Sequence, residues 1–182
     1  MRLYRRWERQ SNFNSKMDTL RTKLADMLSG LQDGGRPSRT ELLAAAEEMR
    51  QWKKANGVAG LWPVPPLMVT ATLDDAMGHG LELIHRYADL AGLRIRALGL
   101  LQTAESVAAA CREQDPALLG LTVLQFDSEE ELALIARNIP ATTRIVAGGP
   151  VFKADPDFAR RVGIHRVASD AADFLKFILS FY

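Results

Sequence analysis

From residue 67 onward, short apolar runs alternate with segments of helical periodicity, and this alternation restricts the chain to few folds. The runs are LMVTAT, LRIRALG, ALLGLTVL, TRIVAGG and IHRVAS. Short aliphatic runs bounded by turn residues are typical of buried strands. Five strand–helix units predict an α/β fold, in which a five-stranded parallel sheet has helices on both faces.

The residues before this region predict a short helical segment. Residues 14–31 carry apolar side chains at helical spacing, and QDGGRPS then ends the pattern. Ser38 and Glu41 have the S-x-x-E spacing of a capping box and begin a second amphipathic stripe, which runs to the NG pair at 56–57.

A change of composition divides the chain. The stretch GVAGLWPVPP has too much glycine and proline for a helix and predicts a linker near residues 57–66. We therefore expect a two-helix segment over residues 1–62 and an α/β domain over residues 63–182. Residues 1–56 hold 12 Lys and Arg against 7 Asp and Glu, but the charges interleave with apolar positions. This favours a solvated helix face or a protein contact over direct nucleic-acid binding.

Length and apolar content limit the class of protein. The chain has 182 residues, of which 47% are hydrophobic, enough for one ordinary core. It contains no apolar run of about 18 residues, and MRLYRRWERQ lacks the apolar stretch of a secretory signal, so we expect a cytoplasmic protein without a membrane span. The single cysteine, Cys111, lies in AESVAAACRE and is expected to be a buried structural thiol.

The expected strand order indicates where a ligand would bind. The flavodoxin-like (Rossmann-like) order 2-1-3-4-5 is the economical arrangement, and such sheets bind ligands beyond the carboxyl ends of the strands where the order reverses. The loops at that edge are LDDAMGHG (73–80), LQFD (124–127) and GGPVF (148–152).

Several kinds of site do not agree with these loops. Asp74 and Asp75 would repel a flavin phosphate at the start of the first helix. A phosphoryl receiver needs an aspartate after the third strand, where this chain has Thr122-Val123-Leu124. His79 and His85 are six residues apart, about 600° of helical rotation, so a protein-only zinc site is not expected. No hydrolase or Walker motif is present.

Small residues at the strand ends leave room for a bulky ligand. Gly148 and Gly149 permit close approach to the backbone, and Thr122 and Ala147 could border a groove for an elongated group. The alternative is that the two glycines form a tight turn. If the groove binds a ligand, Gly149→Trp is predicted to block it.

Residues 67–182 resemble the cobalamin (vitamin B12)-binding domain family in three segments. The family signature is Asp-x-His-x-x-Gly after strand one, Ser-x-Leu at strand three and Gly-Gly after strand four. The counterparts here are Asp75-Ala76-Met77-Gly78-His79-Gly80, Thr122-Val123-Leu124 and Gly148-Gly149. The segments ADLAGLRIRALG, AGGPVFKADPDFARRVG and VASDAADF are also similar.

This resemblance implies a cofactor site that extends along the predicted edge. In the family, a histidine is the lower axial ligand of cobalt and the nucleotide tail lies in a groove lined by the Ser-x-Leu and Gly-Gly segments. The residues expected to bind the cofactor are Asp75, Met77, Gly78, His79, Gly80, Thr122, Leu124, Gly148, Gly149, Pro150, Val151, Phe152, Ala168 and Ser169.

The chain departs from the family at the metal ligand, because Met77 stands where the histidine is expected. A thioether is a weak donor for Co(III), although methionine with histidine serves haem iron. Three possibilities follow: a cobalamin without a protein ligand, a haem or other tetrapyrrole held through His79 or Met77, or a domain without a cofactor. Met77 could instead fill a gap against the core, and Asp75 could cap the following helix.

The resemblance is closest to sensors that bind B12 or haem and regulate transcription. It implies a non-enzymatic sensory or regulatory protein that signals to a regulatory partner through protein contacts. The alternatives are a corrinoid methyl carrier that serves a methyltransferase and a cofactor-free interaction module. Related proteins usually have a four-helix cap, so the two helices of residues 1–62 are expected to form a partial cap or a homodimer seam.

Overall fold

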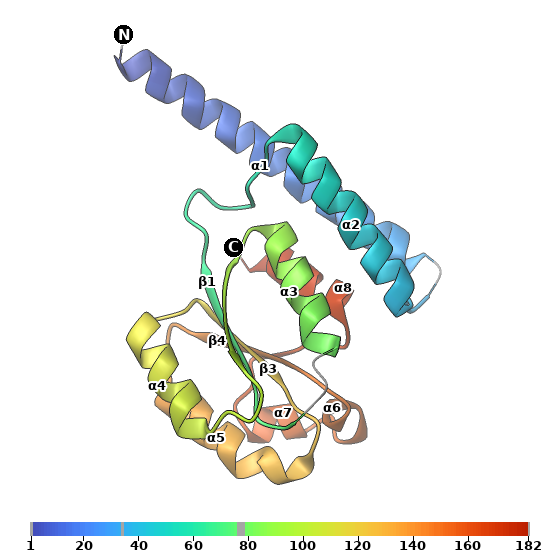
Figure 1. The fold of residues 1–182 in the computed structure, drawn as a ribbon, viewed down its shortest axis with the longest axis vertical. Coiled ribbons are helices and arrows are strands. Elements are labelled where there is room, and N and C mark those ends of the chain that lie inside the picture. Colours follow the sequence, from blue (N-terminus) through green and yellow to red (C-terminus); the bar gives the residue numbers. More distant parts are fainter. Residues whose placement is uncertain (1, 34, 76–78, 182) are drawn as a thin grey trace.

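Five parallel strands form one sheet in the order β2-β1-β3-β4-β5, which confirms the predicted topology (Figure 1). The structure, a computed structural model, describes residues 2–33, 35–75 and 79–181, with the backbone alone for 2–13 and 79. In the three central strands, Thr72 of β1 pairs with Thr122 of β3, which pairs with Gly148 of β4. The strands are β1 (Leu67–Thr72), β2 (Arg94–Gly99), β3 (Leu118–Thr122), β4 (Arg144–Gly148) and β5 (Arg166–Val167).

Helices cover both faces of this sheet, as predicted. One face is covered by α3 (His79–Ala91) and α8 (Ala171–Ser180). On the other face, side chains of α4, α5, α6 and α7 form a second hydrophobic cluster with the sheet. Their bounds are α4 (Ala104–Gln114), α5 (Glu129–Asn138, after the short 3-10 turn Phe126–Ser128), α6 (Val151–Ala154) and α7 (Phe158–Arg161).

The N-terminal residues form a helical hairpin of α1 (Arg2–Gln32) and α2 (Arg39–Asn56). The capping box is confirmed, because the Ser38 amide donates to Glu41 Oε2 at 2.7 Å and the Glu41 amide donates to Ser38 Oγ at 3.3 Å. The predicted start of the first helix at residue 14 is wrong, since α1 begins at Arg2. Residues 2–13 have no regular apolar stripe, but arginine, glutamate and glutamine favour a helix without being buried.

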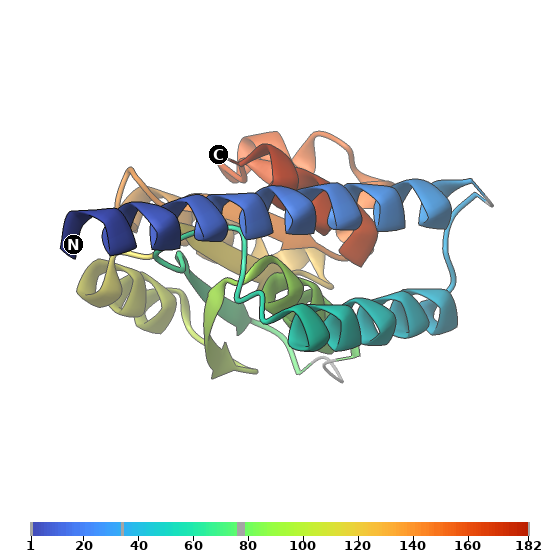
Figure 2. The ribbon, with the colours of Figure 1, turned by 90° about the horizontal axis from the view of Figure 1, so that it is seen from above.

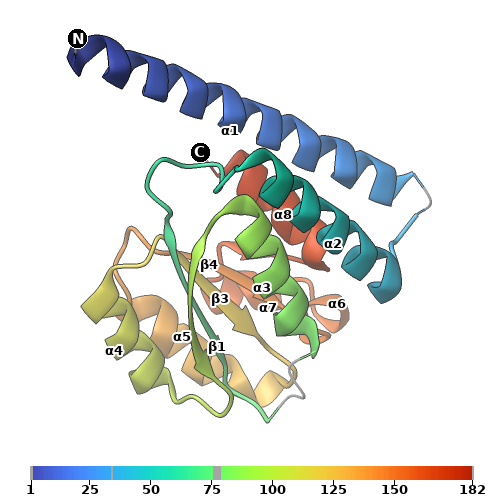
Figure 3. The same cartoon turned by 45° about the horizontal axis from the view of Figure 1, so that its top comes forward.

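The hairpin forms a third layer outside α3 and α8. Figure 2 shows α1 lying over α8 and α2 over α3, and Figure 3 shows the same arrangement from an oblique angle. The first turns of α1 extend beyond the rest of the chain. The helices that were expected to cover a cofactor or to form a dimer seam therefore pack on the helices that flank the sheet.

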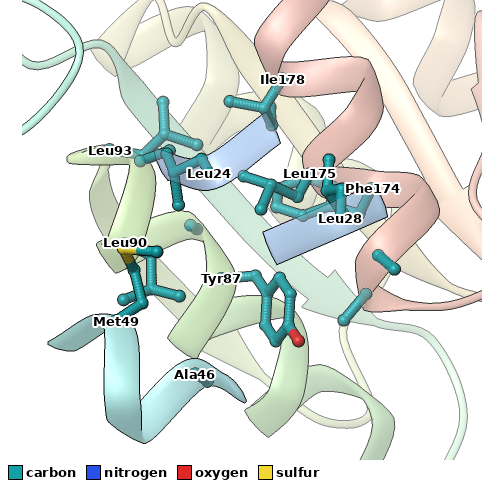
Figure 4. Close-up of a cluster of buried hydrophobic side chains, with 14 of the residues drawn as sticks. Leu24, Leu28, Ala46, Met49, Tyr87, Leu90, Leu93, Phe174, Leu175 and Ile178 are labelled. Atoms are coloured by element: carbon teal, nitrogen blue, oxygen red, sulfur yellow. The ribbon is translucent and has the colours of Figure 1, made fainter. Parts of the chain in front are cut away.

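The hairpin and one face of the α/β domain share a hydrophobic core (Figure 4). Leu24 and Leu28 of α1 lie against Leu175 and Ile178 of α8. The other buried hairpin side chains in this core are Leu20, Leu42, Ala46 and Met49, and those of α3 and α8 include Tyr87, Leu90 and Phe174. Both apolar stripes identified in the sequence are thus used inside the chain. A division at residue 62 and a homodimer remain predictions.

Buried polar groups also join the hairpin to α3. Lys53 Nζ donates to the Asp89 carbonyl at 2.6 Å, and the Tyr87 hydroxyl donates to the Leu42 carbonyl at 3.0 Å. Burial lowers the pKa of Lys53 and raises the pKa of Tyr87, because each charged form would lose hydration. Neither group is buried without a partner, so these bonds also fix the position of α2 along α3.

Two other sequence expectations concern single features. Cys111 is buried on α4, and burial raises the pKa of its thiol to about 11, which keeps it protonated at neutral pH. Within residues 2–33, 35–75 and 79–181, no helix combines the length and the apolar character needed to cross a membrane.

Candidate functional site

A cavity of about 440 Å³ lies between α3, α8 and the strands β1, β3 and β4. Its volume is in the range of small-molecule sites. We call this cavity the groove. The described residues that line it are Met68 and Thr72 of β1; Gly80, Leu81, Leu83 and Ile84 of α3; Gly120, Leu121, Thr122 and Leu124 in and after β3; Val146, Ala147, Gly148 and Gly149 in and after β4; and Ala168, Ser169, Asp170, Ala171 and Phe174 in and before α8.

The groove exists because the strands present small residues toward α3 and α8. Side chains alternate along a strand, so Gly120 and Thr122 of β3 face the same side as Thr72 of β1 and Gly148 of β4. A Cβ atom at Gly148 would lie 3.0 Å from the Ala168 carbonyl oxygen, so a larger residue would displace the segment before α8. The missing side chain of Gly148 leaves depth in the groove, whereas at Gly120 the Met68 methyl group occupies the place that a Cβ atom would take.

A few polar groups interrupt the apolar lining. Thr72 and Thr122 line the groove, and their hydroxyls make no hydrogen bond to another described residue. Asp170 is the single charged residue among the described lining residues. An apolar pocket with a small number of polar groups suits a flat organic ligand that needs to be oriented.

Asp74 holds together the loops at the open end of the groove. Its Oδ2 accepts the Leu124 amide at 3.0 Å, and its carbonyl accepts the Leu101 amide at 3.2 Å. The loop after β1 is thereby connected to the loops after β3 and β2. Leu101 has a φ of 54°, a left-handed conformation that a non-glycine residue seldom adopts. The sequence indicated Asp74 only as a charge that would repel phosphate.

Half of the predicted cofactor residues come together at the groove. They are Gly80, Thr122, Leu124, Gly148, Gly149, Ala168 and Ser169. Pro150 is exposed, whereas Val151 and Phe152 are buried in the cluster on the opposite face of the sheet, so these three do not line the groove. The chain turns at Gly149, and α6 then packs against α7 below the sheet.

The proposed metal ligands are not tested by the structure. Met77 and Gly78 lie outside the described residues, and His79 is described only as the first residue of the α3 backbone. Asp75 is exposed next to them. In the part of the chain that the structure describes, no three His, Cys, Asp or Glu side chains are grouped so that they could hold a metal ion.

Some lining residues were missed in the sequence. Gly120 lies two residues before Thr122 and Met68 lies four before Thr72, so strand alternation places each on the same face of the sheet as its partner. Leu81, Ile84 and Phe174 of the walls lie on helical apolar stripes, and such a stripe does not show which of its residues border a cavity.

Two histidines have structural contacts near the sheet. His85 Nε2 and Thr70 Oγ1 form a hydrogen bond of 2.9 Å between α3 and β1, and His165 Nδ1 accepts the Ile145 amide at 3.0 Å. Burial lowers the pKa of His85 below its ordinary value, and burial together with Arg144 lowers the pKa of His165. Both rings are therefore favoured in the neutral form.

Because the pKa values of His85 and His165 are lowered, we expect the protein to lose stability in weak acid. A folded-state pKa below the unfolded value means that the unfolded chain binds more protons, so stability present above about pH 6.5 falls as the pH drops below it. We expect the melting temperature to decrease from pH 7 toward pH 5, and His85→Gln to make this decrease smaller. A wild-type melting temperature that is constant over this range would contradict the prediction.

The chain resembles solved structures over nearly its whole length. The alignment with a cobalamin-binding protein from Desulfitobacterium hafniense DCB-2 covers 96% of this chain and 88% of that protein, with 15% identity and a TM-score of 0.76. The alignment with the monomethylamine corrinoid protein of Methanosarcina barkeri covers 95% of this chain and 99% of that protein, with 14% identity and a TM-score of 0.56. The methanol:cobalamin methyltransferase complex of the same organism matches with 93% and 68% coverage, 19% identity and a TM-score of 0.61.

Sequence comparison supplies the family. No curated protein matches the chain at a significant level. Residues 67–176, which include every strand and most of α8, match the family described as the B12 binding domain. A family defined by binding agrees with the expected non-enzymatic character of the chain. The chain belongs to the B12-binding domain family.

Proposed function

We propose that this chain is a cobalamin-binding protein that holds the nucleotide tail of the cofactor in the groove and serves a regulatory role through protein contacts. The observation that carries the proposal is the groove itself. It combines a floor of mostly small residues, among them Gly148, with apolar walls from α3 and α8 and with hydroxyl groups that make no hydrogen bond to another described residue.

The residues present fit a nucleotide tail. Its planar aromatic base can lie between the strands and helices, because the groove has a volume of about 440 Å³ and Gly148 adds no side chain to its floor. The Thr72 and Thr122 hydroxyls can donate to polar atoms of the ligand. When bound, cobalamin supplies a cobalt centre whose ligand exchange and redox chemistry respond to its surroundings. The walls α3 and α8 then exclude water from the tail.

A regulatory role is supported by two features of the chain. Met77 stands where a corrinoid carrier is expected to have its histidine ligand. The groove walls α3 and α8 also share their buried side chains with the hairpin, so a ligand that tightens the walls would also stabilise α1 and α2. The partner is then a regulatory protein, and a methyltransferase is the partner in the carrier alternative.

Loading experiments test the binding proposal. Purified protein is incubated separately with hydroxocobalamin, adenosylcobalamin and haemin, desalted, and examined by absorption spectroscopy and mass spectrometry. We expect about one cobalamin per chain. Thr122→Trp should fill the groove above Gly148 and lower retention by at least about tenfold, whereas Thr22→Trp on the exposed side of α1 should not.

Other outcomes have definite meanings. A Soret band retained with haemin alone would move the site to iron and make His79 the first residue to mutate. No retained chromophore would contradict the proposal and leave a cofactor-free interaction module. Equal retention by wild type and a folded Thr122→Trp protein would remove the groove from the site.

Hydrogen exchange tests the regulatory part. Binding of cobalamin is expected to slow amide exchange in α1 and α2 as well as in α3 and α8, because the four helices share one core. Slower exchange confined to the loops after β1, β3 and β4 would contradict a signal through the hairpin and would favour the carrier alternative.

A further inference from the structure

The turn between α1 and α2 contacts the rim of the groove through Arg36. Its Nη2 donates to the Ser169 carbonyl at 2.9 Å, and its Nε lies 3.7 Å from Asp170 Oδ2. Ser169 and Asp170 both line the groove. A side cavity of about 300 Å³ shares Ser169 and Asp170 with the groove, and its other charged lining residues are Arg36, Asp173 and Lys176. The hairpin thus reaches the ligand site at this point.

Two carboxylates lie at this rim: Asp173 is paired with Arg166 at 2.7 Å, and Asp170 is the one that lines the groove. Asp170 Oδ1 accepts the Asp173 amide at 2.9 Å and caps α8. Its charge would repel a phosphodiester entering the groove, and no lysine or arginine is among the described lining residues. Arg36 is the cation that contacts these rim residues by both a hydrogen bond and an ion pair.

Arg36 also has capacity left for a ligand. Its side chain is 55% exposed, and a guanidinium has five N–H donors, more than its contacts with Ser169 and Asp170 use. The planar arrangement of these donors matches two oxygens of a phosphate group.

We propose that Arg36 binds the phosphodiester of the nucleotide tail while it neutralises Asp170, so that the hairpin turn is part of the cofactor site. This inference rests on the proposed function. It explains how a turn outside the matched region 67–176 can affect binding. It also connects occupation of the groove to the position of α1 and α2.

A neighbouring arginine provides a matched control. Arg39 at the start of α2 forms an ion pair with Glu82 of α3 at 3.1 Å, and Arg39 lines neither the groove nor the side cavity. Arg36→Gln and Arg39→Gln therefore remove the same charge from the same end of the hairpin. Both side chains are about half exposed, so both variants are expected to melt near the wild-type temperature.

Affinities for ligands with and without the phosphate test the proposal. The ligand pair is hydroxocobalamin and cobinamide, which lacks the nucleotide and its phosphodiester. Competition of α-ribazole phosphate and of α-ribazole against bound cobalamin makes the same comparison, with and without phosphate, for the nucleotide tail alone. We expect Arg36→Gln to weaken cobalamin and α-ribazole phosphate about tenfold and to leave cobinamide and α-ribazole unchanged. Arg36→Lys should recover part of the loss, and Arg39→Gln should bind all four like wild type.

Each other result has one meaning. An unchanged cobalamin affinity in Arg36→Gln, or an equal loss for ligands with and without phosphate, would overturn the role of Arg36 while the proposed function stands. If Arg39→Gln weakened binding as much as Arg36→Gln, the positive charge of the turn would attract the phosphate in general, and this result would also overturn the specific role of Arg36. A wild-type protein that binds no cobalamin would overturn both the proposed function and this inference.

Discussion

A chain shortened to residues 63–182 is expected to lose stable, cooperative folding. Without the hairpin, the outer faces of α3 and α8 would expose side chains that are now buried, among them Leu90, Leu175 and Ile178. Burial of one large aliphatic side chain contributes about 1.5–3 kcal/mol. The hairpin buries Leu20, Leu24, Leu28, Leu42 and Met49 in the same core, so its loss approaches the whole stability of a typical domain, about 5–15 kcal/mol.

Thermal unfolding followed by circular dichroism, together with size-exclusion chromatography, measures this effect. In the full chain, Leu24→Ala should lower the free energy of unfolding by about 3 kcal/mol, because Leu24 is fully buried. The adjacent exposed Lys23→Ala should change it by less than about 0.5 kcal/mol. A 63–182 protein that is monomeric and melts at the temperature of the full chain would show that the α/β domain is independent.

The arrangement of the sheet was predictable because it depends on local patterns and simple connections. Short apolar runs separated by helical segments predict parallel strands, and the observed order β2-β1-β3-β4-β5 is the economical one for five such units. Ser38 and Glu41 likewise predicted the start of α2 from an interaction within one turn.

The position of the hairpin was not predictable from the same kind of pattern. An amphipathic stripe shows that one side of a helix will be buried, but it does not identify what covers it. Leu24 and Met49 could have faced a cofactor or a second copy equally well. The structure instead buries them against α8 and α3 of the same chain, with Lys53 and Tyr87 fixing the register.

The residues of the candidate site were likewise predictable only in part. Strand ends and the family signature identified the floor residues Thr122 and Gly148, because the fold places those positions at one edge. They did not identify Asp74, whose bond to the Leu124 amide joins residues 50 apart in sequence. They also assigned Val151 and Phe152 to the cofactor, although the turn at Gly149 sends both to the opposite face.

Replacement of Gly149 by alanine is expected to destabilise the fold strongly. Gly149 has a φ of 143°, a conformation that L-residues rarely adopt. A Cβ atom there would collide with the Val123 carbonyl group, which belongs to the backbone and has little freedom to move. The Val123 amide also donates to the Gly148 carbonyl at 2.9 Å, which holds the two segments together. Strain and collision together should cost more than about 3 kcal/mol.

Gly80→Ala is the matched control for this prediction, since Gly80 also lines the groove but a Cβ atom there meets nothing within 4 Å. It should preserve or slightly raise stability, because alanine favours a helix by about 0.5–1 kcal/mol over glycine. Chemical denaturation of both variants gives the comparison. The predicted block of the groove by Gly149→Trp would then report on folding, whereas Thr122→Trp reports on ligand binding. If Gly149→Ala unfolds at the wild-type denaturant concentration, the Val123 segment can yield, and bulky residues at position 149 again become a test of the groove.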